Sequence, residues 1–275
     1  MGKLLRIVLI LLLILLQGCN YPSKQITELE KQLVESINNR PIIIHVNHGL
    51  VTITETDEKY LEISGRSLPD FSPTIKVNTE NTRVFIEINA KQNNIVQSSL
   101  QLYIKIPKQL HVEIDTDNAS VFVQRYSGEI RVNSISGNIT VEKLEGSIFL
   151  QSNRGNIIVR DSSGELGMFG NYGSLTVQNA RGTIKISSIM GDISFSGFIQ
   201  ANDNVHIETD HGTVTIYLDP DSESKISIYS TSGVVVCMLS YINSTLRSCK
   251  GEYKSSSGTL YVRSVSGNVN LKLLP

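Results

Sequence analysis

The stretch that decides the fold runs from Gly128 to Phe195 and reads GEIRVNSIS-GNITVEKLE-GSIFLQSNR-GNIIVRDSS-GELGMFGNY-GSLTVQNAR-GTIKISSIM-GDISF. Residues two and four places after each opening glycine are apolar, as Ile157 and Val159 are after Gly155. Alternation with a period of two is typical of a β-strand, and glycine accommodates the backbone of a turn. Each nine-residue unit is therefore predicted to form one short strand and one turn. The glycines assigned to these turns are Gly128, Gly137, Gly146, Gly155, Gly164, Gly173, Gly182 and Gly191.

Two windings satisfy this repeat. One is an antiparallel meander, and the other is a parallel solenoid with two or three units per coil. The apolar positions recur in identical register in every unit, which stacking of like on like accommodates easily. The Asn-Gly and Asp-Gly signals of tight hairpins are absent from the array. We therefore expect an all-β fold, a parallel β-solenoid (β-helix) built on a nine-residue Gly-x-Ile-x-Val repeat.

The flanking sequence carries the same pattern of glycines and alternating apolar residues. The regular array covers about residues 119–195, since Ala119 is followed by Val121 and Val123. Short alternating runs before it, beginning at Ile42, predict an N-terminal β cap. Later glycines with the same apolar pattern extend the coil toward the C-terminus. Residues 42–275 are therefore predicted to form a single β-solenoid domain.

The first residues have the features of an export signal. Lys3 and Arg6 precede an unbroken apolar run over residues 7–16, which is too short to span a bilayer as a helix. Leu16-Gln17-Gly18-Cys19 follows and resembles a bacterial lipobox. Residues 1–18 are predicted to be a lipoprotein signal peptide and Cys19 the lipidated residue, the alternative being an ordinary secretory signal. Removing Lys3 and Arg6 changes the formal charge from −1 to 23 − 26 = −3, so the lipid would provide the attachment without help from anionic headgroups.

Residues 19–41 are predicted to be a lipid-anchored tether with a short helix. Ile26, Leu29, Leu33 and Ile37 recur at intervals of three and four, which is a helical period, and Pro41 ends the pattern.

Composition excludes some classes of function. The 25 basic residues are balanced by 26 acidic ones among 275 residues, so the basic surface of a nucleic-acid-binding protein is missing. Three cysteines are too few for a disulfide-scaffolded fold. The repeat lacks the aspartates of calcium-binding nonapeptides. We expect no nucleic-acid partner, no cofactor and no metal.

The repeat also resembles a known family. The polar-Gly-x-Ile-x-Val ladder, the strand Ile104-Lys105-Ile106-Pro107, the Asp219-Pro220 break and the segment Ser230-Thr231-Ser232-Gly233 are similar to those of the bacterial "putative adhesin" family. The similarity covers roughly residues 42–275. It implies an extracytoplasmic parallel β-solenoid, related to the toast-rack domains of envelope-stress systems and to auto-transporter adhesin heads. It carries no catalytic residues to transfer.

Few residues are candidates for chemistry. Cys237 and Cys249 remain once Cys19 is lipidated, and in an oxidising compartment they either form a disulfide or stay as two buried thiols. His45 and His48 would face opposite sides of a strand, so they do not form a metal site. The carboxylate pairs Asp115/Asp117 and Asp219/Asp221 fit an enzyme acting on polysaccharides, but turn chemistry explains them more simply. Five tyrosines follow residue 216 and raise the alternative of a binding patch: Tyr217, Tyr229, Tyr241, Tyr253 and Tyr261.

These observations predict a non-catalytic cell-envelope lipoprotein, anchored to a bacterial membrane and acting as an adhesin-like binding or scaffolding module. Polar side chains such as Glu129, Asn138, Asn156 and Asp192 would be displayed on rigid coils. The expected partners are the membrane, through the lipid anchor, and an envelope protein or a glycan. The alternatives are an envelope-stress sensing domain that acts through a membrane partner and, third, a polysaccharide-acting β-helix enzyme.

Overall fold

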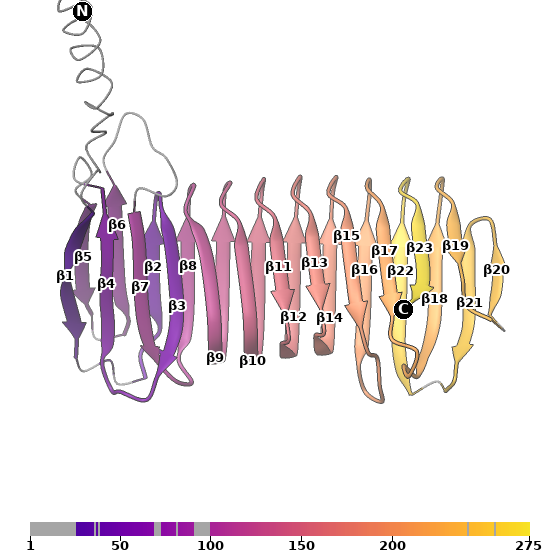
Figure 1. The fold of residues 1–275 in the computed structure, drawn as a ribbon, viewed down its shortest axis with the longest axis horizontal. Coiled ribbons are helices and arrows are strands. Elements are labelled where there is room, and N and C mark those ends of the chain that lie inside the picture. The colour runs from indigo at the N-terminus through magenta and orange to yellow at the C-terminus, as the bar shows by residue number, and fades with distance from the viewer. Residues whose placement is uncertain are drawn as a thin grey trace, which may run out of the picture.

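The computed structural model describes residues 26–35, 37, 39–68, 73–80, 82–90, 100–240, 242–255 and 257–275. Every helix or strand assigned within these ranges is a β-strand, which confirms the predicted all-β class. The strands stack side by side into one elongated body (Figure 1). In chain order they are β1 (Thr27–Val34), β2 (Ile42–Val46), β3 (Leu50–Thr56), β4 (Leu61–Ser67), β5 (Pro73–Thr79), β6 (Val84–Ala90), β7 (Leu100–Pro107), β8 (His111–Thr116), β9 (Ser120–Ser134), β10 (Ile139–Ser152), β11 (Ile157–Arg160), β12 (Ser163–Gly170), β13 (Leu175–Gln178), β14 (Arg181–Ser188), β15 (Ile193–Gly197), β16 (Asn204–Thr209), β17 (Val214–Leu218), β18 (Ser224–Ser230), β19 (Val235–Cys237), β20 (Asn243–Thr245), β21 (Ser248–Tyr253), β22 (Gly258–Ser264) and β23 (Val269–Leu273).

The strands form two stacks that share one core. The first stack, here sheet I, runs β1, β4, β7, β3, the first half of β9, the first half of β10, β11, β13, β15, β17, β23 and β19. The second stack, sheet II, runs β5, β6, β2, β8, the second half of β9, the second half of β10, β12, β14, β16, β22, β18, β21 and β20. The long strands β9 and β10 pass from one stack to the other and so join them.

The array winds in parallel. Ile139 pairs with Val121 on one side and with Ile157 on the other, so neighbouring coils are 18 residues apart and each coil holds two nine-residue units. All sixteen apolar residues of the repeat are buried in the common core. Burial of alternate side chains from both stacks therefore holds the coils together.

The two ends of the stack do not follow chain order. The first coil, β2 and β3, lies between β6–β7 and β8–β9. The last coil, β22 and β23, lies between β16–β17 and β18–β19. The first coil of the chain is thus inserted between two coils that follow it in sequence. The last coil is inserted between two coils that precede it.

The predicted helix in the tether is wrong for the residues that the structure describes. Thr27–Val34 is strand β1, which pairs antiparallel with β4. Leu29 and Val34 contact the core, whereas Ile26 and Leu33 are exposed, so the apolar residues do not form one helical face. A helix this short is marginal without packing, while the open edge of β4 supplies a row of backbone hydrogen-bond partners.

Candidate functional site

One row of outward-facing side chains on sheet II differs from the rest of the surface. The residue between the two buried positions of each unit points away from the core, and the parallel register stacks these residues from coil to coil. We call this row the aromatic row. From β9 to β22 its members are Arg131, Phe149, Gly167, Lys185, His206 and Tyr261.

Gly167 opens a groove in this row. It stands where the neighbouring coils carry Phe149 and Lys185, and a Cβ at this position would lie 3.0 Å from Cδ2 of Phe149. The groove has a volume of about 810 Å³, and Phe169 lines it from the same strand. That volume lies in the range of small-molecule binding sites. The absence of a side chain at Gly167 leaves room for the Phe149 ring beside its backbone, and the rings of Phe149 and Phe169 both line the groove.

Cations and rings alternate around the groove. The guanidinium of Arg131 lies 4.4 Å from the ring centroid of Phe149. Beyond Lys185, the rings of His206 and Tyr261 stack at 4.6 Å, and the Tyr229 ring lies 6.4 Å from that of Tyr261. These contacts hold the rings in place, because cation–π and stacking interactions restrict side-chain rotation.

Carboxylates border the same surface. Glu129 lies 3.0 Å from Nδ1 of His111 and Glu208 lies 3.2 Å from Nε2 of His206. Glu165 and Lys185 are exposed within the groove lining. The site thus combines apolar ring faces with negatively charged hydrogen-bond acceptors and positively charged donors.

Three of the four carboxylates singled out from the sequence, those of Asp115, Asp219 and Asp221, make structural contacts. Asp115 accepts a hydrogen bond from the side-chain amide of Asn133 at 2.9 Å. The carboxylate of Asp219 accepts one from the backbone N–H of Asp221, which closes a turn, and Asp221 pairs with Lys254 at 2.9 Å. The contacts of Asp219 and Asp221 fit the turn interpretation, whereas that of Asp115 links β8 to the neighbouring strand β9.

Part of the predicted polar display is also structural. The side-chain oxygen of Asn138 accepts the backbone N–H of Asn156, and that of Asn156 accepts the N–H of Ser174. Asp192 accepts the N–H of Thr213 in the same way. Asn138, Asn156 and Asp192, which each follow a glycine, therefore link one coil to the next. Glu129 also follows a glycine but lies at the groove.

The other predicted residues lie away from the groove. Cys19 is outside the described residues. Cys237 and Cys249 are joined by a disulfide near the C-terminal end of the stack. The eight glycines line two edges of the coil, where each packs against the residue one coil earlier. Of the late tyrosines, Tyr229 and Tyr261 lie together on sheet II, while Tyr217 lies on sheet I under the amine of Lys272.

Reasoning from the sequence missed the groove itself. Its signal was present, since Phe149 and Gly167 depart from the polar residues that usually fill this position of the unit. The 18-residue register was needed to show that the two positions are neighbours.

The described part of the chain holds no group of three or more His, Cys, Asp or Glu side chains arranged to bind a metal ion. Within the same ranges, no helix is long and apolar enough to cross a bilayer.

Several solved structures are similar to this chain over most of its length. A protein described as a "putative adhesin" from Bacteroides fragilis is 12% identical, with 91% of this chain and 99% of that chain covered and a TM-score of 0.42. Another "putative adhesin", from Parabacteroides merdae, is 13% identical, with coverages of 92% and 98% and a TM-score of 0.42. A "putative lipid binding protein" from Parabacteroides distasonis is 13% identical, with coverages of 90% and 96% and a TM-score of 0.38.

No curated protein matches the chain. The model of the Toastrack DUF4097 family matches residues 39–272, which include all the strands from β2 to β22 and most of β23. This chain therefore belongs to the Toastrack DUF4097 family.

Proposed function

We propose that this protein is a non-catalytic binding module, held outside the cytoplasm by a lipid on Cys19, that takes a glycan in the groove at Gly167. The observation that carries the proposal is the gap in the aromatic row, flanked by Phe149 and Phe169.

The chemistry of the groove fits a sugar. The apolar faces of sugar rings pack against aromatic rings, and sugar hydroxyls can donate to carboxylates and accept from Arg and Lys. The lining carries three carboxylates, of Glu129, Glu165 and Glu208, against the two cations of Arg131 and Lys185, so a neutral oligosaccharide fits better than a polyanion.

Binding to a glycan array, followed by titration calorimetry with the best glycan, tests the proposal. Phe149→Ala is expected to weaken binding at least tenfold because it removes the stacking face, and Gly167→Gln is expected to do so by filling the groove. Ile158→Ala is the matched control, since Ile158 occupies the same place in its unit but faces outward from sheet I. Absence of glycan binding, or equal affinity in all three variants, contradicts the proposal.

The location has its own test. A disulfide between Cys237 and Cys249 forms and persists in oxidising compartments. Protein isolated from the cell envelope, denatured without reductant, is expected to show no free thiol at these two positions. Metabolic labelling with an alkyne palmitate is expected to mark the protein and to fail for Cys19→Ser. Two free thiols, or equal labelling of the variant, would argue against an extracytoplasmic lipoprotein.

A further inference from the structure

One edge of the coil consists of tight turns of the form Ser/Thr-x-x-Gly. In these turns a buried hydroxyl bonds to the backbone three residues on, as Ser134 does to Gly137 and Ser188 to Gly191. The two middle residues of each turn are partly or fully exposed, and we call the row that they form the tight-turn edge. With the equivalent residues of the first coils, its members are Asn47-His48, Asp117-Asn118, Ile135-Ser136, Asn153-Arg154, Asn171-Tyr172, Ile189-Met190, Asp210-His211, Thr231-Ser232 and Val265-Ser266.

Large apolar side chains project from the middle of this edge. Tyr172 is 61% exposed, Met190 and Ile135 are each 54% exposed, and Ile189 is 40% exposed. Backbone hydrogen bonds between successive turns, such as Met190 N–H to the carbonyl of Asn171, hold them at the spacing of the coils. Leu246, 68% exposed, continues the series beside the Ser230–Gly233 turn. Such a row of exposed apolar residues marks an interaction surface.

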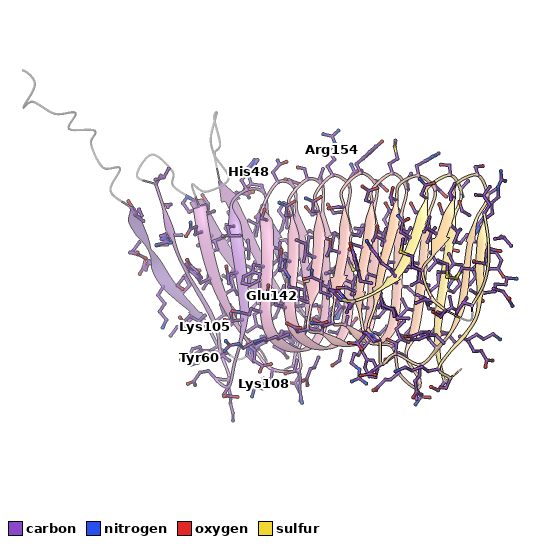
Figure 2. The ribbon with its side chains drawn as sticks, turned by 45° about the vertical axis from the view of Figure 1, so that its right-hand side comes forward. His48, Tyr60, Lys105, Lys108, Glu142 and Arg154 are labelled. Atoms are coloured by element: carbon purple, nitrogen blue, oxygen red, sulfur yellow. A yellow bond between two sulfur atoms is a disulfide. The ribbon has the colours of Figure 1, made fainter. Side chains whose placement is uncertain are left out.

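The opposite edge of the coil is much more highly charged than the tight-turn edge. Only Asp117, Arg154 and Asp210 carry formal charge at the middle positions of the tight turns. The opposite edge carries many more charges: Asp57, Glu58, Lys59, Lys108, Arg125, Lys143, Glu145, Asp161, Arg181, Asp219, Asp221, Glu223 and Lys254. Figure 2 shows the two edges, with His48 and Arg154 at one and Tyr60 and Lys108 at the other.

The N-terminal segment enters at the tight-turn edge. Thr27 pairs with Ser67, Ser67 pairs with Leu100, and Leu100 lies against Gly49 of the first tight turn. Seven residues lie between Cys19 and Thr27, so the eight Cα-to-Cα steps that join them reach about 28 Å when fully extended. A strand of seven residues is about 23 Å long. A tether this short would therefore have to run almost straight along the full length of a strand, from the tight-turn edge to the charged edge, to bring the charged edge to the lipid.

We propose that the tight-turn edge lies on the lipid bilayer, with Tyr172, Ile189 and Met190 entering the interface. The inference rests on the lipid anchor at Cys19 that is part of the proposed function. The long axis of the coil then lies along the membrane, and the groove on sheet II opens sideways, where an extended glycan can reach it.

Fluorescence quenching of the acylated protein tests this placement. Single variants Arg154→Cys and Glu145→Cys carry a polarity-sensitive label at the tight-turn edge and the opposite edge, while Cys237 and Cys249 are held in their disulfide. The vesicles contain phosphatidylethanolamine, phosphatidylglycerol and a nitroxide-bearing lipid. The label at Arg154→Cys is expected to be quenched at least threefold more than the label at Glu145→Cys.

Each negative result of the quenching experiment leads to a different conclusion. Protein that does not float with the vesicles overturns the anchor and this placement with it. Protein that floats but shows equal quenching at both edges overturns the placement alone. Quenching that is absent while the Arg154→Cys label becomes buried as protein concentration rises assigns the edge to a second copy of the chain.

A second set of variants tests the apolar side chains themselves. Replacing Tyr172, Ile189 and Met190 with Ser is expected to reduce quenching at Arg154→Cys at least twofold, with flotation unchanged. Val236→Ser with Met238→Ser is the control, because these exposed residues lie off the tight-turn edge. Unchanged quenching in the triple variant contradicts the proposal.

Discussion

At the residue scale, the repeat glycines are needed for two distinct reasons. Gly128, Gly146, Gly164 and Gly182 have positive φ angles between 104° and 151°, a region that side chains make costly. Gly137, Gly155, Gly173 and Gly191 form the other series, and a Cβ there would lie 1.8–2.1 Å from a carbonyl oxygen of the preceding coil. The second series is therefore required by close approach between coils alone. In the first series a Cβ at Gly146, Gly164 or Gly182 would also lie 2.1–2.2 Å from a carbonyl oxygen of the preceding coil, so both reasons apply there.

Gly155→Ala tests the requirement for close approach. Its Cβ would meet the carbonyl oxygen of Gly137 at 2.0 Å, so the coils must separate locally. We expect the free energy of unfolding to fall by more than about 2 kcal/mol, measured by chemical denaturation. Gly251→Ala is the control, since its nearest neighbours are 3.4 Å or more away, and its effect is expected to stay below about 1 kcal/mol. Equal effects would show that the spacing between coils adjusts freely.

Neighbouring isoleucines on β11 test the two faces of a strand. Ile157 is fully buried, whereas Ile158 faces outward and is partly exposed. Ile157→Asp is expected to cost about 4 kcal/mol or more, because it places an unpaired charge in the core. Ile158→Asp is expected to cost within about 1 kcal/mol. Similar losses in Tm for the two variants would contradict the assignment of the faces.

At the scale of elements, β1 is held to the stack by a carboxylate that bridges three strands. Glu62 on β4 lies 2.9 Å from the amine of Lys31 on β1 and 3.3 Å from the amine of Lys105 on β7. Its side chain is only 12% exposed. The hydrogen bond from Lys31, with that from Lys105, holds the pKa of the Glu62 carboxyl below its usual value against the effect of burial.

This shift gives the stability of the N-terminal end a pH dependence. A carboxylate whose pKa is lower in the folded state stabilises the fold above its unfolded pKa, and that stabilisation is lost as pH falls through the folded pKa. Glu62→Gln is expected to lower Tm at pH 7 and to leave it close to that of the unsubstituted protein near pH 3. Glu252→Gln, at an exposed position of β21, is the control and should change Tm little at either pH. A Tm difference for Glu62→Gln that is equal at both pH values would contradict this role.

At the scale of the whole molecule, a coil is inserted between two others near each end of the stack. β22 and β23 separate the β16–β17 coil from the β18–β19 coil and pair with both. The C-terminal residues therefore hold in place a segment that precedes them in the chain.

Removing residues 258–275 tests this arrangement. Without β22 and β23, the segment from β18 to β21 loses its parallel neighbour, so we expect protease cleavage within residues 219–253 while residues 120–218 stay protected. The control removes only Leu274 and Pro275, which follow β23. Continued protection of β18 in the longer truncation would mean that this segment is stable without the inserted coil.

Much of the middle of the molecule follows from local pattern alone. Alternation such as Ile139-Thr140-Val141 and a glycine every nine residues specify strand, turn and buried face, because both signals act within one unit. Only the tertiary structure decided which unit stacks on which. Thr27–Val34 became a strand because its hydrogen-bond partners lie on β4, far along the chain. The groove exists because an 18-residue register places Gly167 beside Phe149, and such long-range neighbours are set by the pairing of whole coils.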